Sequence, residues 1–229
     1  LVTIWFESGD KETELHYKKG KKAGRETFWY ESGEKKSESH WKSGVQDGLK
    51  SEWQKDGVKC KESNWKNGNQ EGLETEWYES GEKASERYFV NGEQEGLETT
   101  WYKSGAKQLE SHYENGNQEG LETIWLESGE KEKELHYKKG NREGLITFWY
   151  KSGEKLSEGC FLNGKQEGLK TTWYKSGAKQ LESYYKNGEQ EELETTWYES
   201  GEKKSESHWK SGVQDGLKSE WQKDGVKCK

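Results

Sequence analysis

The sequence predicts an all-β fold in which tandem 24-residue β-hairpin repeats form an elongated, twisted single antiparallel β-meander. Three observations predict it. Tryptophan recurs at a constant interval of 24 residues, beginning with Trp5 and Trp29. Glycine falls about every eight residues, a spacing that disfavours helix. Between the Ser-Gly, Asp-Gly and Asn-Gly pairs lie short runs rich in Thr, Trp and Tyr, which favour strands.

The composition is unusual for a folded protein but excludes a disordered one. The chain has 229 residues, of which 35% are charged and 27% hydrophobic, with a net charge of −7. These averages are typical of disorder, yet the chain holds 13 Trp, 12 Tyr and no Pro. No apolar run approaches the roughly 20 residues of a membrane-spanning helix, and no signal peptide is visible. The acidic balance argues against nucleic acid as a partner.

The repeat extends through the whole sequence without insertions. A second aromatic series runs from Tyr17 through Trp41 to Trp209, and three glycine series keep the same interval, one of them broken by Glu192. Residues 29–61 and 197–229 are identical. The sequence also opens and closes within a unit, so we expect residues 1–229 to be a single array of about nine and a half units, cut from a longer chain.

Each unit is expected to hold two antiparallel strands, which in the second unit lie within residues 21–30 and 34–41. We predict three-residue turns at Glu7-Ser8-Gly9 and at Lys18-Lys19-Gly20, each a type I turn closed by a glycine bulge. Phe6 then pairs with Asp10, and Trp5 with Lys11. The expected faces are Leu1, Thr3, Trp5, Lys11, Thr13, Leu15 and Tyr17 on one side, and Val2, Ile4, Phe6, Glu12, Glu14 and His16 on the other. A two-residue turn would scatter the aromatic residues across both faces.

In this register a lysine of each unit lies between successive tryptophans. The sequence therefore predicts a ladder of cation–π contacts, each worth about 0.5–1 kcal/mol when exposed. The ladder is the candidate interaction surface, and its residues are Trp5, Trp29, Trp53, Trp77, Trp101, Trp125, Trp149, Trp173, Trp197 and Trp221 with Lys11, Lys35, Lys59, Lys83 and Lys107. Its tryptophans are expected to hold the sheet together, and the same surface is also suited to binding a protein or a glycan.

No catalytic residue, cofactor or metal site is expected. The five histidines share one position of the repeat, at His16, His40, His112, His136 and His208. Equivalent residues of neighbouring units lie about 9.5 Å apart, which is too far for convergence on one metal ion. Polar residues are spread evenly, unlike the asymmetric groups of an active site.

The chain has three cysteines, Cys60, Cys160 and Cys228. We expect unpaired thiols, which favour a reducing, intracellular compartment. An intermolecular disulfide remains an alternative.

The string from Tyr113 to Gly129, Tyr-x-Asn-Gly-x-x-Glu-Gly-Leu-x-Thr-x-Trp-x-x-Ser-Gly, resembles the MORN repeat, most closely the bacterial-type variant labelled antitoxin-like. The resemblance implies stacked hairpins and a non-enzymatic binding or scaffolding role. Eukaryotic MORN repeats are linked to membrane lipids and to the assembly of cytoskeletal complexes. The sequence departs from the pattern at Arg25, Glu192 and Gly159-Cys160.

We expect a structural or scaffolding protein whose partner is another protein or a second copy of itself, in a homo-oligomer or filament. The alternatives are an antitoxin-like module that neutralises one protein and a module that binds membrane lipid through its lysines and tryptophans. The net charge of −7 weakens the lipid alternative.

Overall fold

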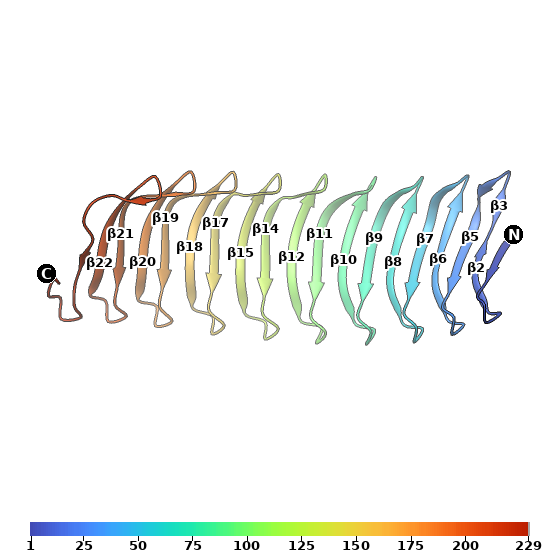
Figure 1. Ribbon diagram of the computed structural model, residues 1–229, viewed down its shortest axis with the longest axis horizontal. Helices are drawn as coiled ribbons and strands as arrows, with labels where there is room; N and C mark the ends of the chain where they lie inside the picture. Colours follow the sequence, from blue (N-terminus) through green and yellow to red (C-terminus); the bar gives the residue numbers. More distant parts are fainter. Residues whose placement is uncertain (229) are drawn as a thin grey trace. The chain divides into compact units, whose positions relative to one another are not determined.

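The computed structural model describes residues 1–228, and within them every regular element is a β-strand. The chain divides into two compact units, residues 1–116 and 117–229. Each unit is an antiparallel meander of tandem hairpins, and Figure 1 shows the strands of each unit side by side in chain order. The predicted fold class is confirmed. No helix in the described part of the chain is long and apolar enough to cross a membrane.

Twelve strands lie in the first unit, where β3 and β4 pair with each other and the remaining ten form the meander. They are β1 (Val2–Trp5), β2 (Lys11–Leu15), β3 (Tyr17–Lys18), β4 (Lys21–Lys22), β5 (Gly24–Trp29), β6 (Lys35–Lys42), β7 (Val45–Trp53), β8 (Lys59–Lys66), β9 (Asn69–Trp77), β10 (Lys83–Val90), β11 (Glu93–Trp101) and β12 (Lys107–Glu114).

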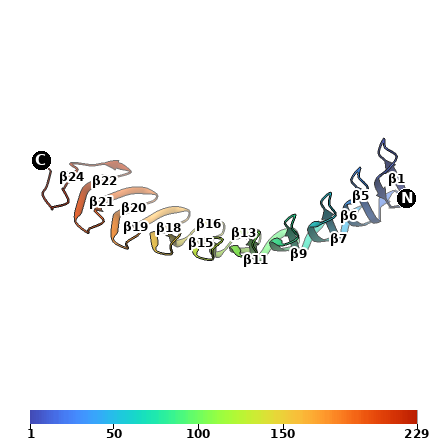
Figure 2. The same ribbon diagram turned by 90° about the horizontal axis from the view of Figure 1, so that it is seen from below.

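The described part of the second unit also holds twelve strands. They are β13 (Asn117–Gln118), β14 (Gly120–Trp125), β15 (Lys131–Lys138), β16 (Asn141–Arg142), β17 (Gly144–Trp149), β18 (Lys155–Leu162), β19 (Lys165–Trp173), β20 (Lys179–Lys186), β21 (Glu189–Trp197), β22 (Lys203–Lys210), β23 (Val213–Gln214) and β24 (Ser219–Glu220). The longer strands are bowed, and the hairpins of each unit are curled rather than flat (Figures 1 and 2).

The first turn of each repeat has the predicted form. Phe6 N–H donates to Asp10 O at 2.9 Å, and Gly9 N–H donates to Phe6 O at 3.0 Å. Trp5 pairs with Lys11. Gly9 has a φ of 91°, a left-handed conformation that glycine adopts without steric cost. The three-residue turn is confirmed.

A bulge directly after this turn overturns the predicted faces. Trp29 pairs with Lys35, but Phe28 pairs with Ser37, so the strand from Lys35 carries one extra residue. Because neighbouring side chains of a strand point to opposite faces, the inserted residue moves everything beyond it to the other side. The prediction that Thr13, Leu15 and Tyr17 share the face of Trp5 is therefore wrong.

The second turn is shorter than predicted. Lys42 pairs with Val45 across a two-residue turn in which Ser43 has a φ of 54° and Gly44 a φ of 92°. Two positive φ angles in succession define a type I′ turn, whose twist matches that of the flanking strands. The predicted three-residue turn at Lys18-Lys19-Gly20 is wrong for the same reason, since Lys18 pairs with Lys21.

A second, wider bulge follows the type I′ turn. Trp41 pairs with Gln46 and Ser39 with Lys50, so three residues of β7 lie opposite His40. Gly48, in the middle of the three, has a φ of 122°. Bulges of this kind need a left-handed residue. This requirement explains the glycine series that runs from Gly24 to Gly216 and is broken by Glu192, which we call the third glycine series.

The register defines two faces. We call one the ladder face, formed by Leu1, Thr3, Trp5, Lys11, Glu14, His16 and their equivalents, and the other the pocket face, formed by Val2, Ile4, Phe6, Thr13, Leu15, Tyr17 and their equivalents. Both faces bury mainly small polar side chains at mid-strand, such as Thr27 and Ser39. Among the described residues only Leu135 and Ile146 are fully buried apolar side chains. Contacts between repeats therefore replace a conventional hydrophobic core.

Candidate functional site

The ladder face carries the tryptophans and lysines selected from the sequence. The Lys35 ammonium lies 5.0 Å from the ring centroid of Trp53 in the following repeat, and Lys59 lies 6.0 Å from the centroids of both Trp53 and Trp77. Further contacts of this kind join Lys11 with Trp29, Lys83 with Trp101, Lys131 with Trp149, Lys155 with Trp173, Lys179 with Trp197 and Lys203 with Trp221, at 5.3–5.9 Å.

Each ladder lysine also has an acidic partner on the same face. Lys35 Nζ lies 2.7 Å from a Glu38 carboxylate oxygen, and Lys107 Nζ lies 2.5 Å from that of Glu110. The same pairing recurs at Lys11–Glu14, Lys59–Glu62, Lys83–Glu86, Lys131–Glu134, Lys155–Glu158, Lys179–Glu182 and Lys203–Glu206. The lysine charge is thus neutralised locally, and the ring faces that it covers are not free for a stacked sugar. A role of the ladder in binding stays a prediction.

Leucines form the exposed border of the ladder face near the type I′ turns. Leu97 is 53% exposed and pairs with His112, and Leu169 is 52% exposed and pairs with Tyr184. The histidines therefore lie on the ladder face, opposite to the prediction. His40 Nδ1 is hydrogen-bonded to Leu49 O at 3.0 Å, which gives this histidine a structural role.

Tyrosine hydroxyls join neighbouring repeats on the pocket face where the repeat carries a tyrosine at this position. Tyr30 Oη donates to Trp53 O at 2.9 Å, and Tyr78 Oη donates to Trp101 O at 2.6 Å. Tyr150, Tyr174 and Tyr198 repeat this bond in the second unit. These tyrosines form a third aromatic series of the sequence, at Tyr30, Tyr78, Tyr102, Tyr150, Tyr174 and Tyr198. The structure explains the series by its contacts between repeats.

Buried glutamates on the pocket face accept hydrogen bonds from several directions. Glu74 is 5% exposed and accepts from Gln70 Nε2 at 2.7 Å. Glu26 accepts from Ser39 Oγ at 3.2 Å, and that hydroxyl in turn accepts from Trp41 Nε1 at 2.9 Å. Buried polar groups are stable only with such partners.

Glu26 and Glu74 occupy the same position of the repeat, and three other repeats have a lysine there, at Lys50, Lys170 and Lys218. A lysine ammonium donates but cannot accept. Within the described residues, two buried side-chain polar atoms have no hydrogen-bond partner, Gln46 Nε2 and Ser183 Oγ. Gln46 lies four residues before Lys50, and Ser183 pairs with Lys170. The sequence alone gave no sign of these unpaired groups, because the partners belong to different strands.

Glutamates at the type I′ turns join the repeats at their edge. The Glu71 carboxylate accepts from Asn91 N–H at 2.8 Å, while Gly92 N–H donates to Gln70 O at 2.9 Å. The Gln-Glu-Gly segment of one repeat therefore caps the Asn-Gly turn of the next. The constant spacing of the two segments is the only sign of this role in the sequence, and it does not by itself predict the cap.

A charged cluster interrupts the pattern in the first unit. Arg87 Nε donates to Glu98 at 2.8 Å, and Lys61 Nζ donates to Glu76 at 2.9 Å and lies 3.0 Å from Glu74. Burial raises the pKa of Glu76, but hydrogen bonding and charge from Lys61, with the charge of Arg87, lower that pKa more, and the net direction is down. Both cations of the cluster are paired with its three carboxylates, so neither cation is free for an anionic ligand.

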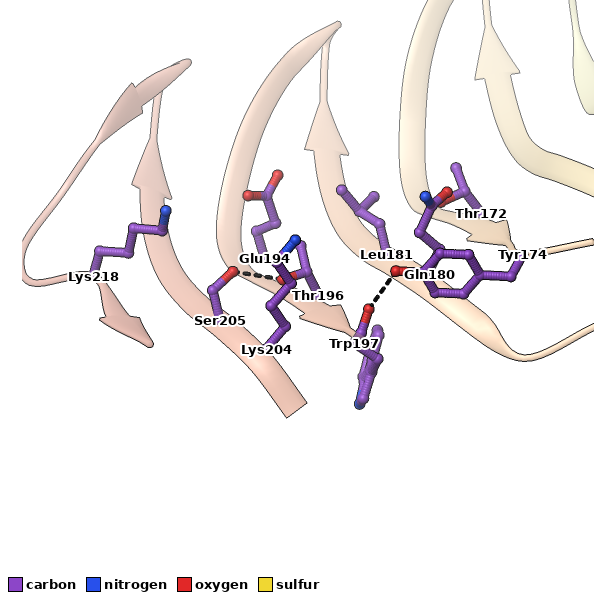
Figure 3. Close-up of a pocket in the computed structure, with 10 residues that line it drawn as sticks. All are labelled: Thr172, Tyr174, Gln180, Leu181, Glu194, Thr196, Trp197, Lys204, Ser205 and Lys218. Carbon is purple, nitrogen blue, oxygen red and sulfur yellow. Dashed lines mark hydrogen bonds between the residues drawn. The ribbon is translucent and has the colours of Figure 1, made fainter. Parts of the chain in front are cut away.

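One opening on the pocket face of the second unit holds about 490 Å³. Figure 3 shows Tyr174 with its hydroxyl on Trp197 O, and Ser205 hydrogen-bonded to Thr196. The remaining lining residues are Thr172, Gln180, Leu181, Glu194, Lys204 and Lys218. Charged, hydroxyl, amide and aromatic groups with a single leucine suit an extended polar segment better than a compact apolar ligand.

The cysteines and the potential metal ligands are the remaining side chains to consider for chemical reactivity. All three cysteines are free thiols, and burial, with the charge of Glu52, raises the pKa of Cys60. A raised thiol pKa lowers reactivity. No group of three potential metal ligands occurs among residues 1–228.

The comparisons agree with this repeat geometry. Residues 22–43, 70–91 and 94–115 match the family described as the MORN repeat variant. These three segments are MORN repeats. Each matched segment covers one strand, the three-residue turn and the following strand, and the starts of the segments differ by one or two repeats. MORN repeats commonly mediate protein or membrane interactions and are generally non-enzymatic. No curated protein matched the chain.

Proposed function

We propose that this MORN repeat protein is a non-enzymatic scaffold that binds an extended segment of a partner protein along its pocket face. The observation that carries the proposal is the difference between the two faces. On the ladder face the rings are covered by lysines that are themselves paired with glutamates. On the pocket face, openings lined by hydroxyl, amide and aromatic groups lie across neighbouring hairpins.

Protein is a better partner than membrane lipid for this arrangement. Binding to anionic lipid draws on about 1 kcal/mol per free lysine or arginine near the surface. Six of the ladder lysines have a carboxylate oxygen at 2.5–2.8 Å from the ammonium nitrogen. Little of their charge is therefore left to attract anionic lipid. Hydroxyl and amide groups, by contrast, suit the backbone of an extended peptide.

The test is selection of peptides from a random phage-displayed library, followed by fluorescence anisotropy with two matched variants. Leu181→Lys alters the pocket face and introduces the residue that another repeat already has at the equivalent position, Lys61. Leu169→Arg alters the ladder face and introduces the residue found at the equivalent Arg25. We expect binding of the selected peptides to weaken at least about tenfold in Leu181→Lys, as for loss of a central interface contact, and to stay within twofold in Leu169→Arg. The reverse pattern would assign binding to the ladder face, and a library without binders would contradict the proposal.

Self-association is the second candidate function, and the leucine border of the ladder face favours it. Seven leucines recur there with exposures of 38–53%, at Leu49, Leu73, Leu97, Leu121, Leu145, Leu169 and Leu193. Repeated exposed apolar groups often mark a protein interface, and a second copy has the same spacing. Light scattering should then show a mass that rises with concentration and falls back to the monomer in Leu169→Arg. A constant monomer mass in the unchanged protein would contradict it.

A further inference from the structure

We propose that a pocket beside Gly159 and Lys170 binds the carboxylate of an aspartate or glutamate side chain of the partner protein. The inference rests on the proposed function, and it specifies the chemistry of the segment that the pocket face receives.

The position of Lys170 is normally that of an acceptor. In equivalent repeats Glu74, Glu98 and Glu194 accept a hydrogen bond from the glutamine four residues earlier, at 2.6–3.0 Å. Glu194 also accepts from Ser207 Oγ across the strands at 3.4 Å. The surrounding groups are therefore arranged to donate to a carboxylate at this position.

At Lys170 these donors remain while the carboxylate is absent. Ser183, paired with Lys170, is 1% exposed, and its hydroxyl has no partner. A buried, unpaired polar group costs about 1–3 kcal/mol. Among the described residues no acidic group lies within ion-pair distance of Lys170. The unpaired Ser183 hydroxyl shows that no group of the chain replaces the missing acceptor, and an added carboxylate therefore meets an unpaired cation at Lys170.

Space for that carboxylate lies on the other side of Lys170. Gly159 pairs with Lys170 where most repeats have serine, and a pocket of about 100 Å³ is found there. The amide of Gln166 reaches into this space, since a Cβ built on Gly159 would lie 3.1 Å from Gln166 Nε2. The pocket has room for roughly three water molecules, the size of a short acidic side chain.

The remaining walls agree with an acidic side chain. Ile146, Phe148 and Phe161 supply apolar contact for its methylene groups, and Ser157 adds a hydroxyl. The Arg142 guanidinium lies 5.9 Å from the Phe161 ring centroid. Glu158 also lines the pocket, but its carboxylate is paired with Lys155 at 2.6 Å. The positive side chains near the pocket thus complement an acidic partner, and complementary charge gives an interface its specificity.

Lys50 provides the matched comparison. It replaces the same glutamate, but its ammonium is paired with Glu52 at 2.5 Å. The equivalent of Gly159 beside it is Ser39, a buried residue. The cation is therefore satisfied and the pocket is filled, so Lys50 should not bind an external carboxylate.

The experiment measures binding of fluorescein-labelled decaglutamate and decaglutamine to the full chain by anisotropy at low salt. We expect decaglutamate to bind and decaglutamine to bind at least about tenfold more weakly, because the charged acceptor is lost. Lys170→Glu, which restores the internal acceptor, should weaken decaglutamate binding at least about tenfold, whereas Lys50→Glu, with the same change in net charge, should weaken it less than about threefold. Gly159→Ser fills the pocket without changing the charge and should act like Lys170→Glu.

Circular dichroism of each variant establishes that it is folded. Equal losses in Lys170→Glu and Lys50→Glu, or equal binding of both peptides, would overturn the inference. Library-selected peptides that depend on Leu181 but not on Lys170 would also overturn it, while leaving the proposed function in place.

Discussion

Replacing Glu192 by glycine should stabilise the second unit. Glu192 is the one departure from glycine at the centre of the wide bulge, and its φ is 60°. A left-handed conformation costs a residue with a Cβ about 1–2 kcal/mol, whereas glycine in a fixed position costs about 0.5–1 kcal/mol of additional chain entropy. The difference favours Glu192→Gly by about 0.5–1 kcal/mol. The Glu192 side chain is exposed, so little contact is lost.

The reciprocal variant is Gly168→Glu, one repeat earlier, where φ is 78° and an added Cβ would meet nothing within 4 Å. It should lose a similar amount, because the backbone conformation alone opposes it. Thermal unfolding followed by circular dichroism should give shifts of about 2–4 °C per kcal/mol in opposite directions. A neutral or destabilising Glu192→Gly, together with a tolerated Gly168→Glu, would refute the assignment of the third glycine series to backbone conformation.

Three further changes test contacts between repeats by thermal or urea unfolding. Ala23→Glu should raise the free energy of unfolding by about 0.5–1 kcal/mol, because it introduces the carboxylate that Glu71 uses to cap the type I′ turn of the following repeat. An unchanged unfolding midpoint would contradict that capping role. Tyr78→Phe should destabilise by about 0.5–1.5 kcal/mol, since it removes the 2.6 Å bond to Trp101 O, and full stability would show that bond to be dispensable. The pKa of Glu76 is below its ordinary 4.5, so its stabilisation is present above that pH and is lost as the pH falls through the lowered pKa. Lys61→Ser should flatten this acid dependence, and an unchanged pH profile would contradict the ion pair.

Local structure was predictable from the repeat wherever the backbone needs a conformation that only one residue type adopts easily. The three-residue turn at Glu7-Ser8-Gly9 was predictable, because a glycine in the left-handed region closes a common hairpin turn. The pairing of Trp5 with Lys11 followed directly from it. The cation–π spacing between repeats followed as well, since it needs only the local pairing and a constant repeat length.

The assignment of residues to faces was not predictable in the same way. The bulge between Lys35 and Ser37 has no glycine and no distinctive residue to mark it. Grouping the aromatic residues on one side was reasonable for an apolar core, but the structure uses tyrosine hydroxyls and tryptophan rings to link repeats on both faces. The hydrophobic pattern therefore misled the register beyond the first turn.

The sequence by itself determined that this is an all-β chain of tandem 24-residue repeats with a constant first turn, because period, glycine placement and strand propensity are local properties that act identically in every unit. Only the tertiary structure decided which side chains share a face and which donors lack an acceptor. Those facts depend on single-residue bulges and on partners in neighbouring strands, such as Lys170 between Gly159 and Ser183. A shift of one residue in the hydrogen-bond register moves every side chain beyond it to the opposite face.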